Sequence, residues 1–143
     1  RQYAGILEFD RANVTALNNM ANCLILAGKT EEGAAQYGKA LALRPEDPKL
    51  HYNMAMALSQ LGRSREAESH LREAERLDPA YGGRVNYALA EIYARQSRKE
   101  EALEHLEKAL DRGFKDTAGL EKDETFRELW ELERFRLLLR GER

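Results

Sequence analysis

Apolar residues recur at intervals of three and four along most of this chain, which is the spacing of one face of an amphipathic helix. The pattern predicts helices at residues 15–27, 31–43, 49–61, 65–77, 84–96 and 99–111. Gly28 and Gly62 follow the first and third of these segments, and glycine is favoured where a helix stops in the left-handed conformation. Thr30 and Ser64 are expected to cap the helices that follow. The chain is therefore predicted to be a series of helix–turn–helix hairpins.

The predicted hairpins repeat along the chain with a period of 34 residues. Pro45 and Pro79 end the second helix of successive hairpins at this spacing, and a third copy follows at an offset of 35. Residues 6–10 match residues 40–44, so the chain is expected to open inside another repeat. One hairpin cannot bury its own apolar face, and the hairpins are therefore expected to stack in series.

Small residues occupy matching positions on the paired helices, where they allow close approach. They are Ala21, Ala55 and Ala90 on the first helices, and Gly33, Ala67 and Ala102 on the second helices. Glycine within a helix costs about 0.5–1 kcal/mol relative to alanine. Gly33→Ala is therefore expected to raise the melting temperature if the hairpin tolerates one methyl group, and to lower it if the helices touch too closely.

The recurring positions resemble the pattern of the tetratricopeptide repeat (TPR) family. In the first full repeat they are Leu17, Met20, Ala21, Leu24, Gly33, Tyr37, Ala40 and Pro45. In the second they are His51, Met54, Ala55, Leu58, Ala67, Leu71, Ala74 and Pro79, and in the third Asn86, Leu89, Ala90, Tyr93, Ala102, Leu106 and Ala109, with Phe114 in place of the proline. The resemblance covers residues 1 to about 113. It implies an all-α fold, a right-handed α-solenoid of stacked antiparallel helix hairpins.

A single domain is expected over residues 1–143, with three full repeats between a partial repeat and a cap. The expected parts are 1–13, the second helix of a truncated repeat, then repeats at 14–47, 48–82 and 83–115, and capping helices at 116–143. The tail resembles the helical segment that closes many bacterial TPR arrays. Asp123 is expected to cap a helix there, and the expected buried bulk is Trp130, Leu132, Phe135 and Leu139. Residues 124–140 form either one helix or two that are broken near Glu131.

The resemblance also implies a concave groove that is lined by the first helix of each hairpin. The family's groove positions carry Asn18, Asn22, Lys49, Tyr52, Asn53, Met56, Arg84, Tyr87 and Glu91 in this sequence. Amide side chains suit an extended peptide because each can donate to and accept from backbone groups. Packing between repeats is the competing role for Asn19 and Asn53.

A related hypothesis is the family's carboxylate clamp, which holds the C-terminal tail of heat-shock chaperones. Asn22, Asn53 and Arg84 match three clamp positions, whereas Asn18 and Ala88 stand where the family has cationic residues. Two missing charges leave too little to hold twin carboxylates, so a full clamp is rejected. Arg84 and Lys49 are kept as candidates for a single acidic group.

Composition and charge exclude several other classes. With a net charge of −2 in 143 residues, the chain lacks the basic excess of a general nucleic-acid binder. No apolar run approaches the length that spans a bilayer. The single cysteine, Cys23, excludes an internal disulfide and falls on an apolar face, where core packing is expected.

Catalytic and metal-binding chemistry is not expected. The Gly28-Lys29-Thr30 segment lacks the earlier glycine of a phosphate-binding loop, so it is assigned to a hairpin turn. His70 and His105 occupy equivalent positions on second helices and are expected on the solvated face, while His51 is expected to pack. No nucleophile–base set emerges and no cofactor is implied. The chain is therefore predicted not to be an enzyme.

Three functions are compatible with these observations. The favoured one is a protein–protein interaction scaffold that binds an extended peptide or a partner helix in the groove. The second is a regulatory or substrate-docking domain attached to an enzyme outside this chain. The third is self-assembly through the exposed N-terminal positions Tyr3, Ile6, Leu7 and Phe9. Because residue 1 is Arg, the sequence is expected to be an excerpt or a processed chain, and it does not distinguish a cytoplasmic from a periplasmic location.

Overall fold

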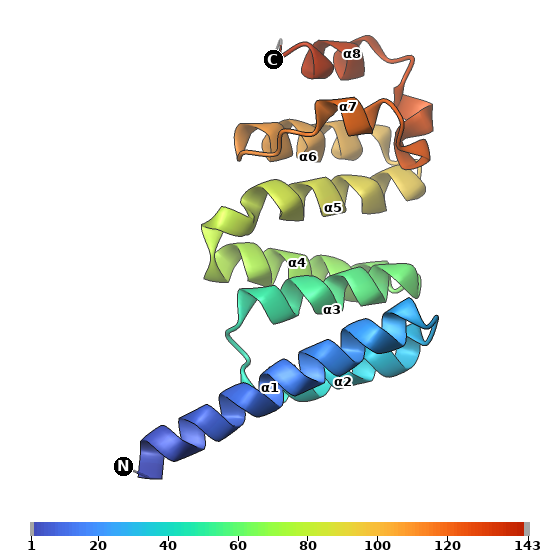
Figure 1. The fold of residues 1–143 in the computed structure, drawn as a ribbon. Helices are drawn as coiled ribbons and strands as arrows, with labels where there is room; N and C mark the ends of the chain where they lie inside the picture. The colour runs from blue at the N-terminus through green and yellow to red at the C-terminus, as the bar shows by residue number, and fades with distance from the viewer. Residues whose placement is uncertain (1, 142–143) are drawn as a thin grey trace. The chain divides into compact units, whose positions relative to one another are not determined.

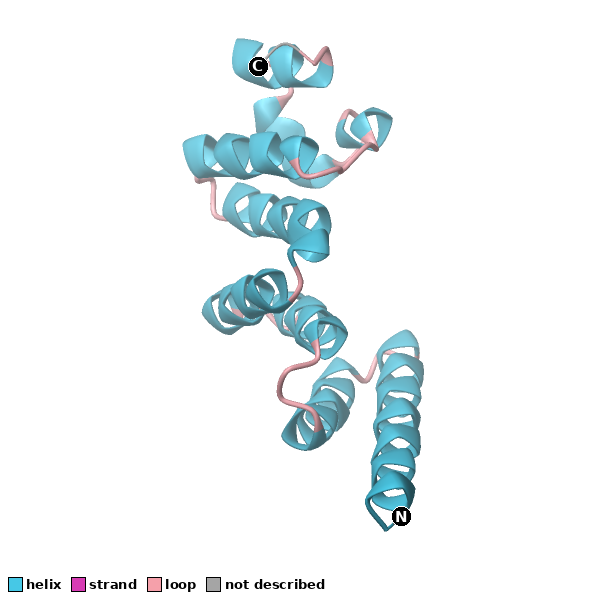
Figure 2. Ribbon diagram, turned by 90° about the vertical axis from the view of Figure 1, so that its left-hand side faces the viewer, coloured by secondary structure: helices cyan, strands magenta, loops and turns pink. Residues whose placement is uncertain are grey.

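The computed structural model describes the backbone of residues 2–141 and the side chains of residues 11–141. Its elements are α1 (Gln2–Leu26), α2 (Thr30–Leu43), α3 (Pro48–Gln60), α4 (Ser64–Leu77), η1 (Pro79–Tyr81), α5 (Gly82–Arg95), α6 (Lys99–Asp111), α7 (Thr117–Leu120), η2 (Glu124–Leu129) and α8 (Glu133–Leu139) (Figure 1). Figure 2 shows helices joined by loops, without a strand in the described part of the chain. The predicted all-α class of helical hairpins is confirmed.

The chain divides into two compact units, Arg1–Leu77 and Asp78–Arg143. The first unit contains the antiparallel hairpins α1–α2 and α3–α4. The second contains the hairpin α5–α6, with η2 packed against α5 and α8 packed against α6. Both units are therefore built on helical hairpins, two in the first unit and one in the second, as the repeat pattern predicts.

The turns within the hairpins follow the glycine signals in the sequence. Gly28 and Gly62 have φ angles of +84° and +79°, so both adopt the left-handed conformation that was expected of them. In the third hairpin the equivalent residue is Ser97, which adopts a φ of 59° in spite of its side chain. The turn geometry is therefore kept even where the sequence supplies no glycine.

The predicted caps at Thr30 and Ser64 are wrong. These residues are the first residues inside α2 and α4. The backbone carbonyls of Lys29 and Arg63 already accept from the N–H groups of residues 33 and 67, at 3.0 Å each. The helical hydrogen bonds therefore begin one residue earlier than the threonine and serine signals indicated.

The two helices that were predicted at residues 1–13 and 15–27 are one continuous helix, because α1 runs without interruption from Gln2 to Leu26 (Figure 1). The prolines that end the later repeats, Pro45 and Pro79, have no counterpart in residues 10–15, which also lack glycine. Nothing in this segment stops a helix. The side chains of Tyr3, Ile6, Leu7 and Phe9 lie outside the described residues.

The small residues at the repeat positions are where the paired helices meet. The side chains of Ala21, Ala55, Ala67, Ala90 and Ala102 are fully buried, with exposed fractions of 0%. Larger apolar side chains at other repeat positions are also buried, such as Tyr37, Leu71 and Leu106. The hairpins are therefore held by close packing of the kind that leaves no room for added bulk.

Gly33 and Gly38 in α2 provide a matched test of this close packing. A Cβ atom on Gly33 would lie 2.7 Å from Ile25 Cγ1 and 3.0 Å from the carbonyl oxygen of Ala21, whereas one on Gly38 would lie 3.6 Å from Met54 Cε. Overpacking typically costs about 1–3 kcal/mol, which exceeds the gain of about 0.5–1 kcal/mol from removing a helical glycine. Gly33→Ala should therefore lower the melting temperature, and Gly38→Ala should raise it. A rise for both variants in thermal unfolding would show that the α1–α2 contact is looser than the structure indicates.

The C-terminal segment fully buries only part of the set of side chains that was predicted to be buried there. Phe126, Leu129 and Phe135 are at most 1% exposed, whereas Trp130 is only half-buried and its indole N–H donates to the carbonyl of Leu120 at 3.1 Å. In a 3₁₀ helix residues three apart share a face, so η2 places Phe126 and Leu129 together and leaves Trp130 beside them. Leu132 and Leu139 are also partly exposed. Burial of Phe135 is confirmed, whereas Trp130, Leu132 and Leu139 are buried only in part.

Residues 124–140 form two helices, η2 and α8, which settles the alternative that the sequence left open. Asp123 caps the first of them, as predicted, because its carboxylate accepts from the N–H of Thr125 at 3.0 Å. The segment between the two helices contains Glu131, near the expected break.

Candidate functional site

A cleft of about 310 Å³ lies in the first unit, between α1, α2 and α3. It is lined by Asn22, Ile25 and Leu26 from α1, Tyr37 from α2, and Asn53, Met56, Ala57 and Gln60 from α3. Three of the predicted ligand contacts, Asn22, Asn53 and Met56, are therefore brought together in one concave site. Tyr37 and Gln60 were not predicted, because the repeat pattern marks Tyr37 only as a packing position.

Hydrogen bonds between the helices fix the amide groups of this cleft. The buried Tyr37 donates its hydroxyl hydrogen to Asn22 Oδ1, and burial raises the pKa of the phenol so that it stays protonated. Asn53 Nδ2 donates to Asn18 Oδ1 at 3.1 Å, which ties α3 to α1. Asn18 is 9% exposed, so its contribution is to packing between the hairpins. Asn22 is exposed and presents its amide to solvent.

The cleft combines an apolar floor with uncharged polar groups. Ile25 and Met56 are partly buried, while Leu26 is 88% exposed at the edge of the cleft. Gln60 accepts from the hydroxyl of Thr30 at 3.4 Å. None of the lining residues carries a charge. Such a surface favours an uncharged ligand with both apolar and hydrogen-bonding groups.

The other predicted contacts of the first unit lie outside this cleft. Lys49 is exposed at the start of α3, where its backbone N–H donates to the capping carboxylate of Asp47 at 3.0 Å. Tyr52 is half-buried on the same helix.

In the second unit, the predicted contact Tyr87 lies against the C-terminal segment. Its hydroxyl donates to Asp123 Oδ2 at 2.7 Å, its ring stacks on Phe114 at 4.4 Å between centroids, and its edge meets Phe126 at 5.6 Å. Arg84 places its guanidinium 4.9 Å from the centre of the Tyr81 ring and is exposed. The structure therefore brings Tyr87 to the cap and leaves Arg84 at the surface.

The pKa of the Glu91 carboxyl group is raised above its ordinary value. Burial, followed by the nearby charge of Asp123, raises the pKa of Glu91 to about 7, although Arg95 acts in the opposite direction. Burial and the hydrogen bond to Asp123 also raise the pKa of Tyr87. Burial raises the pKa of Asp123 as well, but the hydrogen bonds from Tyr87 and Thr125 outweigh it and the net pKa is lowered. The groove pattern gave Glu91 but no indication of Asp123, the carboxyl group that acts on it.

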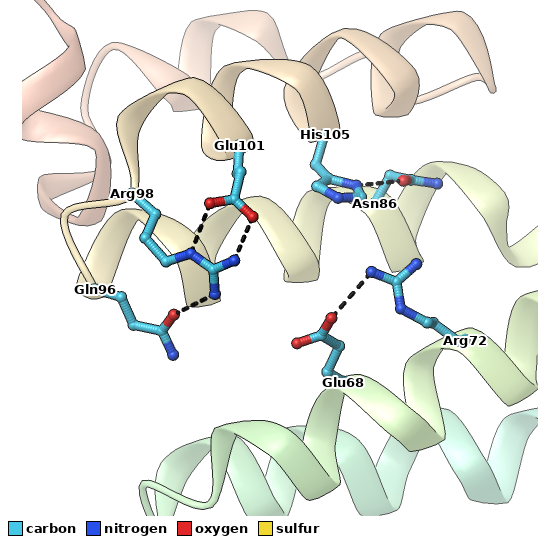
Figure 3. A network of polar contacts seen from close by, with 7 residues as sticks. All are labelled: Glu68, Arg72, Asn86, Gln96, Arg98, Glu101 and His105. Carbon is cyan, nitrogen blue, oxygen red and sulfur yellow. Dashed lines mark hydrogen bonds and ion pairs between the residues drawn. The ribbon is translucent and has the colours of Figure 1, made fainter.

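The histidines do not lie on the solvated face, so that prediction is wrong. His105 is 7% exposed and its Nδ1 donates to Asn86 Oδ1 at 2.9 Å (Figure 3). In the preceding hairpin His51 and His70 are 2.9 Å apart between their Nδ1 atoms, and His51 Nε2 donates to the carbonyl of Pro45 at 2.8 Å. His51 Nδ1 therefore accepts from His70. The expected packing role of His51 agrees with these contacts.

The pKa of His70 is lowered by burial and by the neighbouring His51, which outweigh Glu66 and Glu73. His70 is therefore held uncharged at neutral pH, where it can keep its Nδ1–H directed at His51. These histidines fasten the two helices of a hairpin to each other.

Cys23 is exposed, which contradicts the predicted core packing. Ala21 and Ile25 of the same helix face the interior, and a residue two positions away from each points to the opposite side of a helix. The apolar face of this helix is therefore formed by Ala21 and Ile25 and does not include Cys23.

The described residues contain no group of three or more histidine, cysteine, aspartate or glutamate side chains that could hold a metal ion. In the same part of the chain, no helix is both long enough and apolar enough to cross a bilayer. Pairs such as Arg72–Glu68 and Arg98–Glu101 form on the helix surfaces (Figure 3). They are largely solvated ion pairs of small energetic weight.

Two models of one family, the tetratricopeptide repeat, match residues 13–80 and 52–116 of this chain. The chain is 39% identical over 85 residues to the TPR repeat-containing thioredoxin TTL4 of Arabidopsis thaliana, a match that covers 59% of this chain and 12% of that protein. It is 33% identical over 78 residues to the small glutamine-rich tetratricopeptide repeat-containing protein 2 of Mycosarcoma maydis, covering 52% of this chain and 21% of that protein. The chain thus spans a small part of these relatives.

Solved structures share the fold at lower identity. The first TPR of Spaghetti (RPAP3), bound to the HSP90 peptide SRMEEVD, superposes with a TM-score of 0.69 at 24% identity, covering 82% of this chain and 94% of that chain. The Yersinia enterocolitica type III secretion translocator chaperone SycD gives a TM-score of 0.70 at 17% identity and covers 96% of each chain. MamA gives 0.72 at 19% identity, covering 98% of this chain and 84% of that chain.

Proposed function

Because this chain belongs to the tetratricopeptide repeat family, we propose that it is a non-catalytic interaction scaffold that binds an uncharged stretch of extended peptide. The single observation that carries this proposal is the cleft in the first unit, which joins an apolar floor to exposed amide groups. The ligand would lie along α1 and α3, at Asn22, Asn53 and Met56.

The chemistry of the cleft defines the kind of peptide. Ile25 and Met56 offer contact area for one bulky apolar side chain, and the exposed Leu26 would lose water when that side chain enters. Asn22 would bond to the peptide backbone, since an amide both donates and accepts. The Tyr37 hydroxyl donates a hydrogen bond to Asn22 Oδ1 and so fixes the orientation of the Asn22 amide. A peptide with an apolar side chain between free backbone groups fits these features.

The comparison with RPAP3 supports peptide binding but not the same ligand. That structure holds the HSP90 peptide SRMEEVD, which carries several acidic groups. The lining of the present cleft has no cation, and Asn18 and Ala88 stand at two positions where a carboxylate clamp requires charge. Lys49 in the first unit and Arg84 in the second, both exposed, are each proposed as a separate contact for an acidic group outside the cleft, and Tyr52 as an aromatic contact.

Two methionines allow a matched test of this proposal. A displayed library of random linear peptides is selected against the chain, and the affinity of a recovered peptide is measured by fluorescence polarisation. Met56→Glu places a charge in the cleft and should weaken binding about 30-fold, since a central interface residue often carries about 2 kcal/mol. Met20→Glu alters an exposed methionine of α1 outside the cleft and should leave the affinity unchanged.

Two outcomes would contradict the proposal. One is that the library yields no peptide. The other is that the recovered peptide binds the Met56 variant as tightly as the original chain, which would place its site elsewhere. The melting temperatures of both variants separate lost binding from lost folding.

A second function is a docking domain of a longer enzyme, which the similarity to the thioredoxin TTL4 favours. The cleft would then hold a substrate segment or a segment of the enzyme itself. Capture of the same recovered peptide by the intact protein, with a change in its catalytic rate, would support this role. An unchanged rate would contradict it.

A further inference from the structure

One side of α1 exposes apolar residues and no charged ones. Residues 12–28 contain no charged residue, although 34% of the whole chain is charged. The exposed residues that share this side, which we call the outer face of α1, are Ala16, Met20, Cys23 and Ala27. Met20 is 52% exposed. An uncharged apolar face on an otherwise charged surface is typical of an interface between proteins.

The following repeat shows what packs on such a face. The positions 34 residues further along, on α3, are Leu50, Met54, Ala57 and Leu61. Leu50 and Ala57 are at most 2% exposed, because they share a buried cluster with residues of α2 such as Tyr37 and Ala40. Met54 and Leu61 pack against the same cluster. The outer face of α1 is therefore the counterpart of a face that α2 covers in the next repeat.

The α2 side of that interface also has a counterpart, which lies in residues 2–10. Tyr37, Ala40 and Leu41 of the buried cluster correspond to Tyr3, Ile6 and Leu7, again at an offset of 34.

Gly38 identifies one pair of positions that meet across the α2–α3 interface. A Cβ atom on Gly38 would lie 3.6 Å from Met54 Cε. The equivalent pair is Ala4 and Met20. The sequence of α1 thus contains both sides of one helix–helix interface.

Within one copy these two sides cannot meet. The helix α1 is continuous, and the sixteen residues from Ala4 to Met20 span about 24 Å at a rise of 1.5 Å per residue. With 25 residues against 14, α1 is also much longer than α2, and its first part extends past α2 (Figure 1). Residues 2–10 therefore lie where a second molecule can reach them.

We propose that the chain forms a symmetric dimer, in which residues 2–10 of each copy pack on the outer face of α1 in the other copy. The two α1 helices would run antiparallel, as α2 and α3 do across their short connection at residues 44–47. Ala4 of each copy would then meet Met20 of the other. Because both copies make the same contacts, the assembly closes as a twofold dimer.

The dimer does not depend on peptide binding, because the residues of the outer face do not line the cleft. Peptide affinity and oligomeric state can therefore be measured as separate properties of the same variants.

Sedimentation equilibrium tests the dimer. As its concentration rises, the original chain should reach twice the 16.4 kDa of one copy. Met20→Glu places a charge in each of the two contacts and should raise the dissociation constant of the dimer at least about 30-fold. Met56→Glu is the matched control, because Met56 lines the cleft, so this variant should bind peptide weakly and keep the dimer. The melting temperatures of both variants show whether they remain folded.

A cross-link tests which residues meet. The single cysteine is removed by Cys23→Ser, and Ala4→Cys and Met20→Cys are introduced together. A short bismaleimide linker should then join two chains, and the product should keep twice the mass of one chain under denaturing conditions.

Three outcomes would overturn the dimer. One is the mass of a single copy at every concentration of the original chain. Another is a dimer that Met20→Glu leaves unchanged. The third is a linker that joins the two cysteines within one chain, which would show that residues 2–10 fold back on their own helix.

Discussion

Phe126→Ala should lower the free energy of unfolding of the second unit by about 3–5 kcal/mol, the range for removing a buried phenylalanine from a core. Phe126 is 0% exposed, and it packs edge-on against Tyr87. Alanine would leave a cavity beneath the tail and remove the aromatic contact that holds η2 to α5. Denaturant unfolding followed by circular dichroism measures the loss.

Trp130→Ala is the informative comparison for this prediction. Tryptophan is the largest apolar side chain of the tail, and size alone would give it the larger effect. Because Trp130 is only half-buried, its replacement should cost clearly less than that of Phe126. Equal losses, or a larger one at Trp130, would show that the tail packs in a different register from the one described here.

The hairpin architecture was predictable from the sequence because each signal is local. Pro45 and Pro79 end helices, Gly28 and Gly62 supply left-handed turns, and the alanine positions mark close contacts. The bounds of α6 agree with the predicted residues 99–111. In α1 the same reasoning failed, since the absence of a stop signal joined two predicted helices into one.

The errors at single residues have two physical causes. An apolar period of three and four does not determine which side of a helix is buried to within one residue, and Cys23 was placed on the wrong side. The histidines were assigned to solvent because their partners, Asn86 and His51, lie 19 residues away on the facing helix. A polar residue that is paired across a hairpin can be buried without cost, and the sequence does not show the pairing.

The candidate site was predictable in part. Family groove positions gave Asn22, Asn53 and Met56, which line one cleft. The same positions gave Tyr87 and Glu91, but the hydrogen bond from Tyr87 to Asp123 and the effect of Asp123 on the pKa of Glu91 depend on the path of the C-terminal segment, which no repeat rule describes. Asp123 was identified only as a helix cap, and nothing in the sequence connects it with a carboxyl group 32 residues earlier.

Asn86→Ala should lower the free energy of unfolding of the second unit by about 2–4 kcal/mol. Asn86 is 2% exposed; its Nδ2 donates to the carbonyl of Gly82 at 2.8 Å, and its Oδ1 accepts from His105 Nδ1 at 2.9 Å (Figure 3). With alanine at position 86, the Nδ1–H of His105 would lose its buried acceptor and the carbonyl of Gly82 would lose its donor. Each such unpaired group costs about 1–3 kcal/mol. The relaxed neighbours recover part of that cost.

The preceding hairpin indicates which substitution should restore the pair. There His51 occupies the position equivalent to Asn86 and meets His70, the equivalent of His105, at the same 2.9 Å. Asn86→His should therefore retain more stability than Asn86→Ala, because its imidazole can again accept from His105. A double-mutant cycle with His105→Ala measures the coupling, which is expected at about 1–2 kcal/mol. Additive losses in that cycle would show that Asn86 and His105 act separately, and the hairpin would then be held by its apolar contacts alone.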